Sequence, residues 1–241
     1  MDDLAQLINA SASHQELLEN GPPAQPLQFP PPRIGNAQRT TAIVHNPVTA
    51  EEAQVPNVVY EVGGMAPNRG YWIGRKLKKA IYGCVRSCTV IKLRPGSTWT
   101  GSNFRLGGET VWEVTQETAV VKIVEWDRVR TLHGQHMEDP VKEVAAMQYL
   151  CKDCTAPNLP EILDVMSDEK YLYLFMPFYS GGELFDYVER GGRFSEPVAR
   201  FWFRQILNVS FVKCFVWPCL LSLSPNQTLI DYLIFLKPHV L

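Results

Sequence analysis

Five β-rich segments with one helix between the third and the fourth constrain the fold of this 241-residue chain most strongly. Isoleucine, valine, threonine and tyrosine are frequent in these segments, as expected of strands. The predicted strands are 71–77, 83–93, 111–124, 161–165 and 171–176. Before the fourth strand, Asp139 is a suitable N-cap and Pro140 a suitable first residue of a helix that runs to about Leu150. Two shorter helices are predicted at 184–190 and 196–208.

The residues before this block form a segment of different composition. Residues 1–66 contain a short amphipathic stretch and then prolines that are concentrated between Pro22 and Pro32. Prolines of this density favour an extended, solvated backbone. We therefore predict a disordered, proline-rich leader over residues 1–66, and docking of an SH3 or WW module on the prolines stays open as an alternative.

The residues after the block, 209–241, are hydrophobic without a persistent period and are predicted to form an irregular tail. A membrane span is disfavoured, because a span needs about 20 consecutive apolar residues and Lys213, Pro218 and the polar stretch 222–228 interrupt the run. Two origins of this tail stay open: a translated intron or a genuine short isoform.

The overall composition excludes several classes of protein. The net charge is −2, so no basic excess points to nucleic acid as a partner. No secretory signal opens the chain and its six cysteines form no disulfide framework, which favours a reducing, cytoplasmic location. Cys151 and Cys154 alone have metal-like spacing, and a zinc site needs about four ligands, so no metal site is predicted.

One lysine and one glutamate are candidates for a functional pair. Lys122 lies near the end of the third predicted strand, in the sequence Ala-Val-Val-Lys, and needs an acidic partner to hold its ammonium in place. Glu143 follows 21 residues later, on the predicted helix. It shares one helix face with Met147 and Leu150, which lie four and seven residues further on. That face is expected to turn toward the sheet and to bring the carboxylate to Lys122.

From about Tyr71 to Asn208 the order of motifs resembles the protein kinase family. The resemblance rests on segments similar to the first strand, the glycine-rich loop, the V-A-I-K strand, the helix glutamate, the hinge between the two lobes and the first helix of the C-terminal lobe. In this sequence these segments are 72–77, 78–85, 119–122, Glu143, 171–185 and 194–207.

The resemblance implies an α+β fold for a partial kinase domain at 67–208. Its parts would be an N-terminal lobe with an antiparallel sheet of about five strands and one key helix, then the hinge and two short helices. It also implies ATP as the cofactor, Mg²⁺ as its companion ion, and phosphorylation of serine or threonine in protein substrates.

The resemblance also assigns site residues. Lys122 would bind the α- and β-phosphates and pair with Glu143, and Met176 would be the gatekeeper at the back of the pocket. The other implied contacts are Gly83 in the glycine-rich loop, Val85 and Val120 over the adenine, the Pro177 carbonyl and the Tyr179 N–H at the adenine edge, and Glu183 near the ribose.

The sequence departs from the family pattern in three places. Lys78 and Ala80 replace the first two glycines of the loop, residues 96–108 form a long insertion, and neither His-Arg-Asp nor Asp-Phe-Gly occurs in the 241 residues. Those two motifs supply the catalytic base and the metal ligands. We therefore expect no catalytic residue, no metal ligand and no turnover in this chain. The alternative is a non-catalytic, kinase-like binding or regulatory module.

Overall fold

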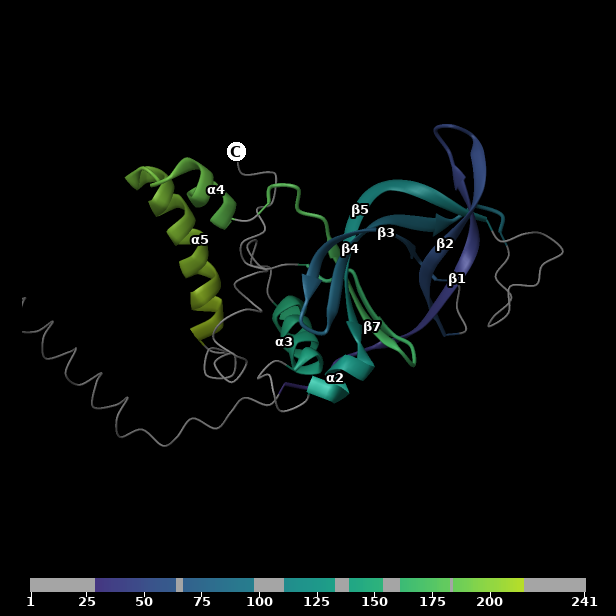
Figure 1. The fold of residues 1–241 in the computed structure, drawn as a ribbon, viewed down its shortest axis with the longest axis horizontal. Coiled ribbons are helices and arrows are strands. Elements are labelled where there is room, and N and C mark those ends of the chain that lie inside the picture. Colours follow the sequence, from purple (N-terminus) through teal and green to yellow (C-terminus); the bar gives the residue numbers. More distant parts are fainter. Residues whose placement is uncertain are drawn as a thin grey trace, which may run out of the picture.

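The computed structural model describes residues 29–63, 67–97, 111–132, 139–153, 161–182 and 184–214, and in this part of the chain it contains seven strands and four helices (Figure 1). In chain order these are β1 (Gly35–Asn46), β2 (Glu51–Val62), β3 (Gly70–Ala80), β4 (Gly83–Leu93), β5 (Val111–Glu125), α2 (Trp126–Leu132), α3 (Pro140–Asp153), β6 (Asp164–Ser167), β7 (Tyr171–Pro177), α4 (Leu184–Gly191) and α5 (Glu196–Cys214). All five predicted strands and all three predicted helices have counterparts, although β6 lies at Asp164–Ser167 instead of 161–165, and α2 was not predicted.

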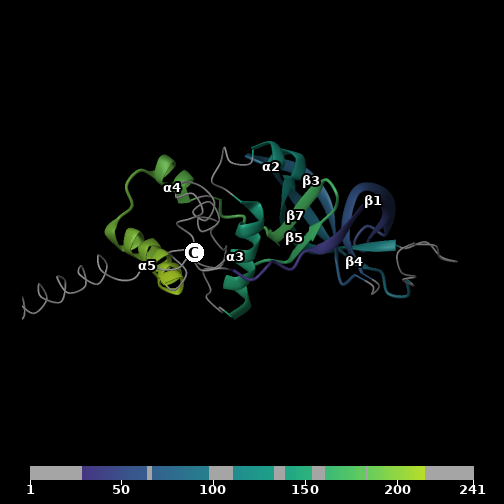
Figure 2. The same ribbon diagram turned by 90° about the horizontal axis from the view of Figure 1, so that it is seen from below.

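The strands form a closed barrel in the order β1-β2-β3-β4-β5-β7-β6. Neighbours in this order are antiparallel, and β6 closes the barrel by pairing with β1 in parallel. A second parallel contact joins β1 to β5. Figures 1 and 2 show α3 beside this barrel, with α4 and α5 farther out on the same side. The sheet is thus mostly antiparallel, and closure removes the open edges that invite unwanted pairing.

The first two strands correct the prediction of a disordered leader over residues 1–66. Residues 35–46 and 51–62 form β1 and β2, so the barrel has two more strands than the five predicted. Pro56 argues against a strand, but the register shifts beside it, between Thr40 and Ala42. Asn57 there adopts a positive φ of 62°, which asparagine tolerates. A bulge therefore accommodates a proline that a regular ladder would exclude.

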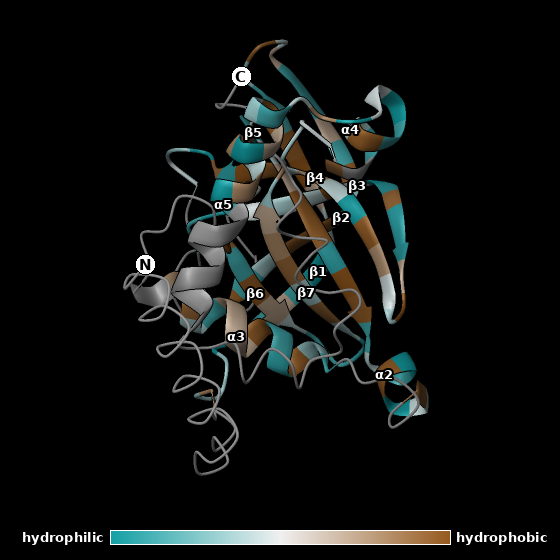
Figure 3. Cartoon of the chain, turned by 90° about the vertical axis from the view of Figure 1, so that its left-hand side faces the viewer, coloured by the Kyte–Doolittle hydropathy of each residue, from teal (hydrophilic) through white to brown (hydrophobic). Residues whose placement is uncertain are grey.

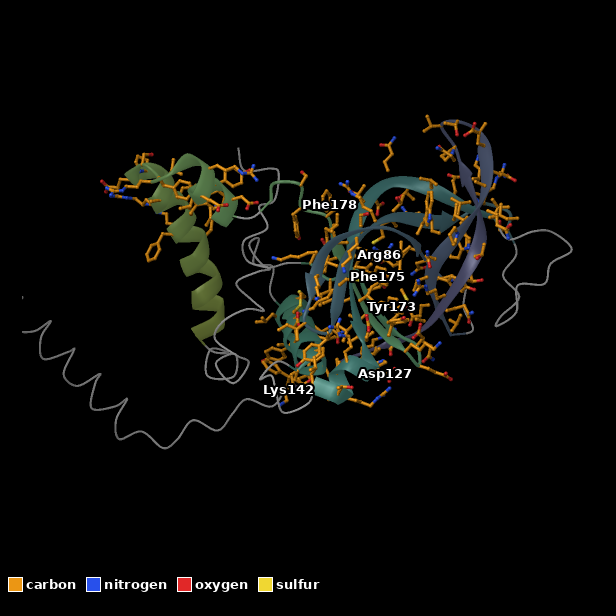
Figure 4. The ribbon with its side chains drawn as sticks, in the orientation of Figure 1. Arg86, Asp127, Lys142, Tyr173, Phe175 and Phe178 are labelled. Carbon is orange, nitrogen blue, oxygen red and sulfur yellow. The ribbon has the colours of Figure 1, made fainter. Side chains whose placement is uncertain are left out.

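The barrel interior is a core of aliphatic and aromatic side chains. The rings of Tyr71 and Phe175 stack with centroids 3.7 Å apart, and Tyr173 lies 6.2 Å from Phe175 along the same strand. Figure 4 labels both β7 aromatics, and Figure 3 shows the strands carrying alternating hydrophobic and hydrophilic residues. Tyr71 donates a hydrogen bond to Asp164, which also lies 3.5 Å from Arg69. Burial and the Asp164 carboxylate raise the pKa of the Tyr71 hydroxyl, so it stays a donor.

A second core lies outside the barrel, where α3 and α2 cover one face of β5 and β7. Val144 and Met147 of α3 are buried there against Val124, Leu172 and β7 neighbours. The first turn of α3 is capped as predicted, because the Asp139 carboxylate accepts from the backbone N–H groups of residues 141 and 142. The cap and the apolar contacts together fix how α3 lies on the sheet.

Helix α5 continues beyond the predicted end at Asn208. It runs to Cys214, so the first six residues of the predicted irregular tail are helical, and residues 215–241 lie outside the described part. Within the described residues, no helix is both long enough and apolar enough to cross a membrane. Most of the predicted insertion at 96–108 also lies outside the described residues.

Candidate functional site

The alternation of side chains along β5 sets up the candidate site. Val121 and Ile123 are buried in the barrel interior. Lys122 lies between them in sequence, and therefore on the opposite face, which α3 covers. In the sheet, Lys122 pairs with Val85 of β4 on one side and with Leu174 of β7 on the other. Directly paired residues of antiparallel strands share a face, so Val85 lies beside Lys122 on the outer face.

The next row of the sheet adds two further predicted residues to the same face. Val120 of β5 pairs with Met176 of β7. Met176 is 3% exposed and belongs to the core under α3, against which Val120 packs. A register slip of one residue would turn all of these side chains into the barrel, so the apolar core that fixes the register also fixes the site.

Lys122 and Glu143 form a close ion pair. The Lys122 Nζ lies 2.8 Å from both Glu143 carboxylate oxygens. The two side chains are 12% and 7% exposed, in contrast to the exposed Lys92–Glu117 pair, whose side chains are more than half exposed. Burying two charges is costly unless they are paired with good geometry. The pair therefore fixes the Lys122 ammonium group in position where β5 and α3 meet.

Gly83 begins β4 at a point of close backbone contact. A Cβ at this position would lie 2.0 Å from the Ile123 carbonyl oxygen, so only glycine fits. The preceding residue, Tyr82, is buried, and its carbonyl accepts a 2.8 Å hydrogen bond from the N–H of Glu125. The turn between β3 and β4 is thus held against the end of β5. Packing within the sheet explains this glycine without any ligand.

The predicted hinge follows β7. Pro177 is the last residue of β7 and pairs with Ala119, and the next residue, Phe178, donates its N–H to the Thr118 carbonyl at 3.3 Å (Figure 4). Tyr179 is partly buried, and this burial raises the pKa of its hydroxyl. The segment is therefore tied to β5, beside Val120. Glu183 lies outside the described residues, and the adenine and ribose contacts remain predictions.

Metal-ligating groups are not clustered in the part of the chain that the structure describes. There, no set of three or more histidine, cysteine, aspartate or glutamate residues is positioned to hold an ion. Cys151 lies in α3, and the second cysteine of the Cys-x-x-Cys spacing, Cys154, lies outside the described residues.

Sequence reasoning missed two features of this site. One is Tyr82, whose burial in the core under α3 follows from the tight turn. The other is the pairing of Lys78 with Val85, which depends on irregularities in β3. Neither feature could be predicted from the expected strand boundaries. A bulge, for example, shifts the pairing of Lys78 without changing the composition of the strand.

Comparisons with known proteins agree with this geometry. A family profile described as the protein kinase domain matches residues 109–211, from the residues just before β5 into α5. These residues are therefore similar to part of a protein kinase domain. The relatives include a probable serine/threonine-protein kinase, fhkD, of Dictyostelium discoideum, 31% identical over 110 residues. CBL-interacting serine/threonine-protein kinases 9 and 16 of Arabidopsis thaliana are 33% and 32% identical over 95 and 94 residues.

The kinase matches cover only part of each protein. They span 44%, 39% and 39% of this chain, and 14%, 20% and 19% of these three relatives. The family profile includes the Lys122–Glu143 pair and the hinge, and it begins after β3 and β4. The family match therefore covers the half of the site that carries the ion pair.

Proposed function

We propose that this chain provides the ATP-binding lobe of a serine/threonine protein kinase. The observation that carries the proposal is the buried Lys122–Glu143 pair, with Nζ 2.8 Å from both carboxylate oxygens, on the sheet face that also bears Val85, Val120 and Met176. An ammonium held beside an apolar surface suits a nucleotide, which joins a flat apolar base to a charged phosphate chain. The names of the relatives support the serine/threonine class.

The proposed roles of the side chains follow from their chemistry. Lys122 donates to phosphate oxygens, and Glu143 holds its ammonium extended across the gap between β5 and α3. Val85 and Val120 enclose the base, with Met176 behind it. The Pro177 carbonyl, the Tyr179 N–H and Glu183 complete the proposed contacts along the hinge. This set fits ATP because it combines one positioned cation with an apolar wall.

The family resemblance implies Mg²⁺ as the companion of ATP, but the described residues provide no set of ligands for this ion. The described residues hold no cluster of three ligating side chains, and the 241-residue sequence has no Asp-Phe-Gly. We assign no residue to the ion. The sequence also has no His-Arg-Asp, which supplies the catalytic base in the family. We propose that a polypeptide of these 241 residues binds ATP without transferring its phosphate.

Calorimetric titration of ATP into the purified 241-residue chain and two lysine variants tests this proposal. Lys122→Met removes the proposed phosphate contact, and Lys92→Met removes a lysine from the exposed ion pair on β4. A charge-assisted hydrogen bond contributes about 1.5–3 kcal/mol, so Lys122→Met should weaken ATP binding about ten-fold or more. Lys92→Met should leave it within about two-fold. Absence of ATP binding by the unaltered chain, or equal affinities of the two variants, would contradict the proposal.

The predicted lack of phosphate transfer needs a separate assay. The unaltered chain, incubated with radiolabelled ATP, Mg²⁺ and a general protein substrate, should release and transfer no label above the level of the Lys122→Met variant. Transfer that depends on Lys122 would show that the missing motifs are dispensable here and would overturn this part of the proposal.

A further inference from the structure

The hairpin of β3 and β4 is strongly basic. No acidic residue occurs between Glu61 and Glu109, in a chain whose net charge is −2. The cations of the hairpin that lie nearest its turn are Arg75, Lys76, Lys78, Lys79 and Arg86. The first four are exposed. Charged residues are common on exposed strands, so exposure alone explains these cations. It does not distinguish the position of one cation from that of another.

The register of the hairpin does distinguish them. Lys76 pairs with Arg86, and Arg86 pairs with Val121, which is buried in the barrel interior. Arg86 thus belongs to the interior face, and its guanidinium donates to the Gly74 carbonyl at 2.9 Å (Figure 4). Lys79 pairs with Cys84, which continues the same face.

Lys78 belongs to the opposite face. It pairs with Val85, and Val85 pairs with Lys122, so the three side chains form one row on the face that α3 covers. This row exists because the pairing of β3 shifts by one residue between Lys76 and Lys78. Without that shift, Leu77 would pair with Val85 and Lys78 would turn to the interior face. Bulges of this kind often redirect a side chain beside a functional site.

The spacing allows the two lysines to act on one ligand. Neighbouring strands lie about 4.8 Å apart, so the backbones of Lys78 and Lys122 are separated by about 10 Å, with Val85 between them. Lys122 is held by Glu143, but the exposed Lys78 side chain has a flexible four-carbon stem that can lean toward it. The Glu143 carboxylate offsets the charge of Lys122, so a second ammonium would strengthen the attraction of this face for phosphate.

We infer that Lys78 is a second phosphate-binding side chain and supplies, as an ammonium, the contact that the loop backbone cannot make. The inference rests on the proposed ATP-binding function. Lys78 and Ala80 stand where the resemblance places glycines, whose bare backbone would lie close to phosphate. The row Lys78–Val85–Lys122 places one cation on each side of the valine that covers the base. The phosphate chain would then lie between two lysines.

The test compares Lys78→Ala with Lys79→Ala in the full chain. The two residues are adjacent, exposed and equally charged, but they lie on opposite faces of the hairpin. Affinities for ATP, adenosine and inorganic tripolyphosphate are measured by calorimetry at two salt concentrations. Lys78→Ala should weaken ATP and tripolyphosphate binding about ten-fold and leave adenosine within about two-fold. Lys79→Ala should change none of the three by more than about two-fold, and Lys78→Arg should restore most of the loss.

The outcomes separate this inference from the function on which it rests. ATP binding that depends on Lys122 but responds equally to Lys78→Ala and Lys79→Ala would overturn the inference and keep the function. The same holds if Lys78→Ala weakens adenosine as much as ATP, because the side chain would then act on the base or the fold. Failure of the unaltered chain to bind all three probes would overturn both.

Discussion

Replacing Gly83 by alanine tests how tightly the turn of the β3–β4 hairpin is seated on β5. The new Cβ would lie 2.0 Å from the Ile123 carbonyl oxygen and 3.1 Å from its carbonyl carbon. A carbon–oxygen contact needs more than 3 Å, so β4 and β5 must separate by about 1 Å at this point. Both partners are backbone atoms in the sheet, so no side-chain rotation can relieve the contact.

The expected cost of this substitution comes from two sources. Inserting an unaccommodated methyl group typically costs about 1–3 kcal/mol. Displacing the turn also endangers the hydrogen bond from the Glu125 N–H to the Tyr82 carbonyl, and a hydrogen bond contributes about 0.5–1.5 kcal/mol. The free energy of unfolding should therefore fall by about 1.5–4.5 kcal/mol, as the sum of the two contributions.

Urea denaturation followed by tryptophan fluorescence measures this loss. The control is Gly63→Ala, because a Cβ at Gly63 has nothing within 4 Å and its φ is not positive. The control should change the stability by less than about 1 kcal/mol. If Gly83→Ala and Gly63→Ala gave equal midpoints, the close seating of the turn on β5 would be refuted.

Three further predictions concern the ion pair, an attachment of α3 and a buried thiol. Glu143→Gln should lower the unfolding free energy by about 1–3 kcal/mol, measured in urea at neutral pH, because it removes the negative charge that faces a buried ammonium. Gln148→Ala should lower the unfolding free energy by about 1–2 kcal/mol in the same assay. The reason is that the Gln148 amide accepts from the Arg33 N–H at 2.8 Å and donates to the Arg33 carbonyl at 2.7 Å. An unchanged midpoint would contradict this prediction. Burial raises the pKa of the Cys88 thiol from 9.0 to about 12. As the pH rises, the thiol is therefore deprotonated in the unfolded state before it is in the folded state. The unfolding free energy should fall by about 1 kcal/mol between pH 9 and pH 10. Cys88→Ala should remove that part of the pH dependence in parallel urea titrations, and an unaltered dependence would contradict the assignment.

Except for α2, which was not predicted, the strands and helices of the kinase-like block could be predicted because each has a local signal. The predicted strand 83–93 coincides with β4, and α3 begins at Pro140 with the Asp139 cap in place. The partner of Lys122 could also be named, since the i, i+4, i+7 pattern of α3 turns Glu143 toward the sheet. Local patterning and tertiary packing agree in this region.

The extra strands and the face of Lys78 could not be predicted from local signals. β1 has one buried residue, Val44, and gains its place by pairing with β2, β5 and β6. Such long-range pairing leaves little trace in composition, and the nearby prolines pointed to disorder. The bulge that turns Lys78 outward is likewise a property of two paired strands, and its effect on side-chain direction follows only from their register.

The most direct test of the central claim maps the lysine that lies beside bound phosphate. An acyl phosphate of ATP carries a biotin-bearing acyl group, which a nearby lysine amine takes up as an amide with release of ATP. After digestion, mass spectrometry of the full chain should find the label on Lys122, and excess ATP present during the reaction should prevent this labelling. Lys92, which is exposed on β4, serves as the internal control. Label spread evenly over exposed lysines and unaffected by ATP would contradict the assignment of this face as a nucleotide site.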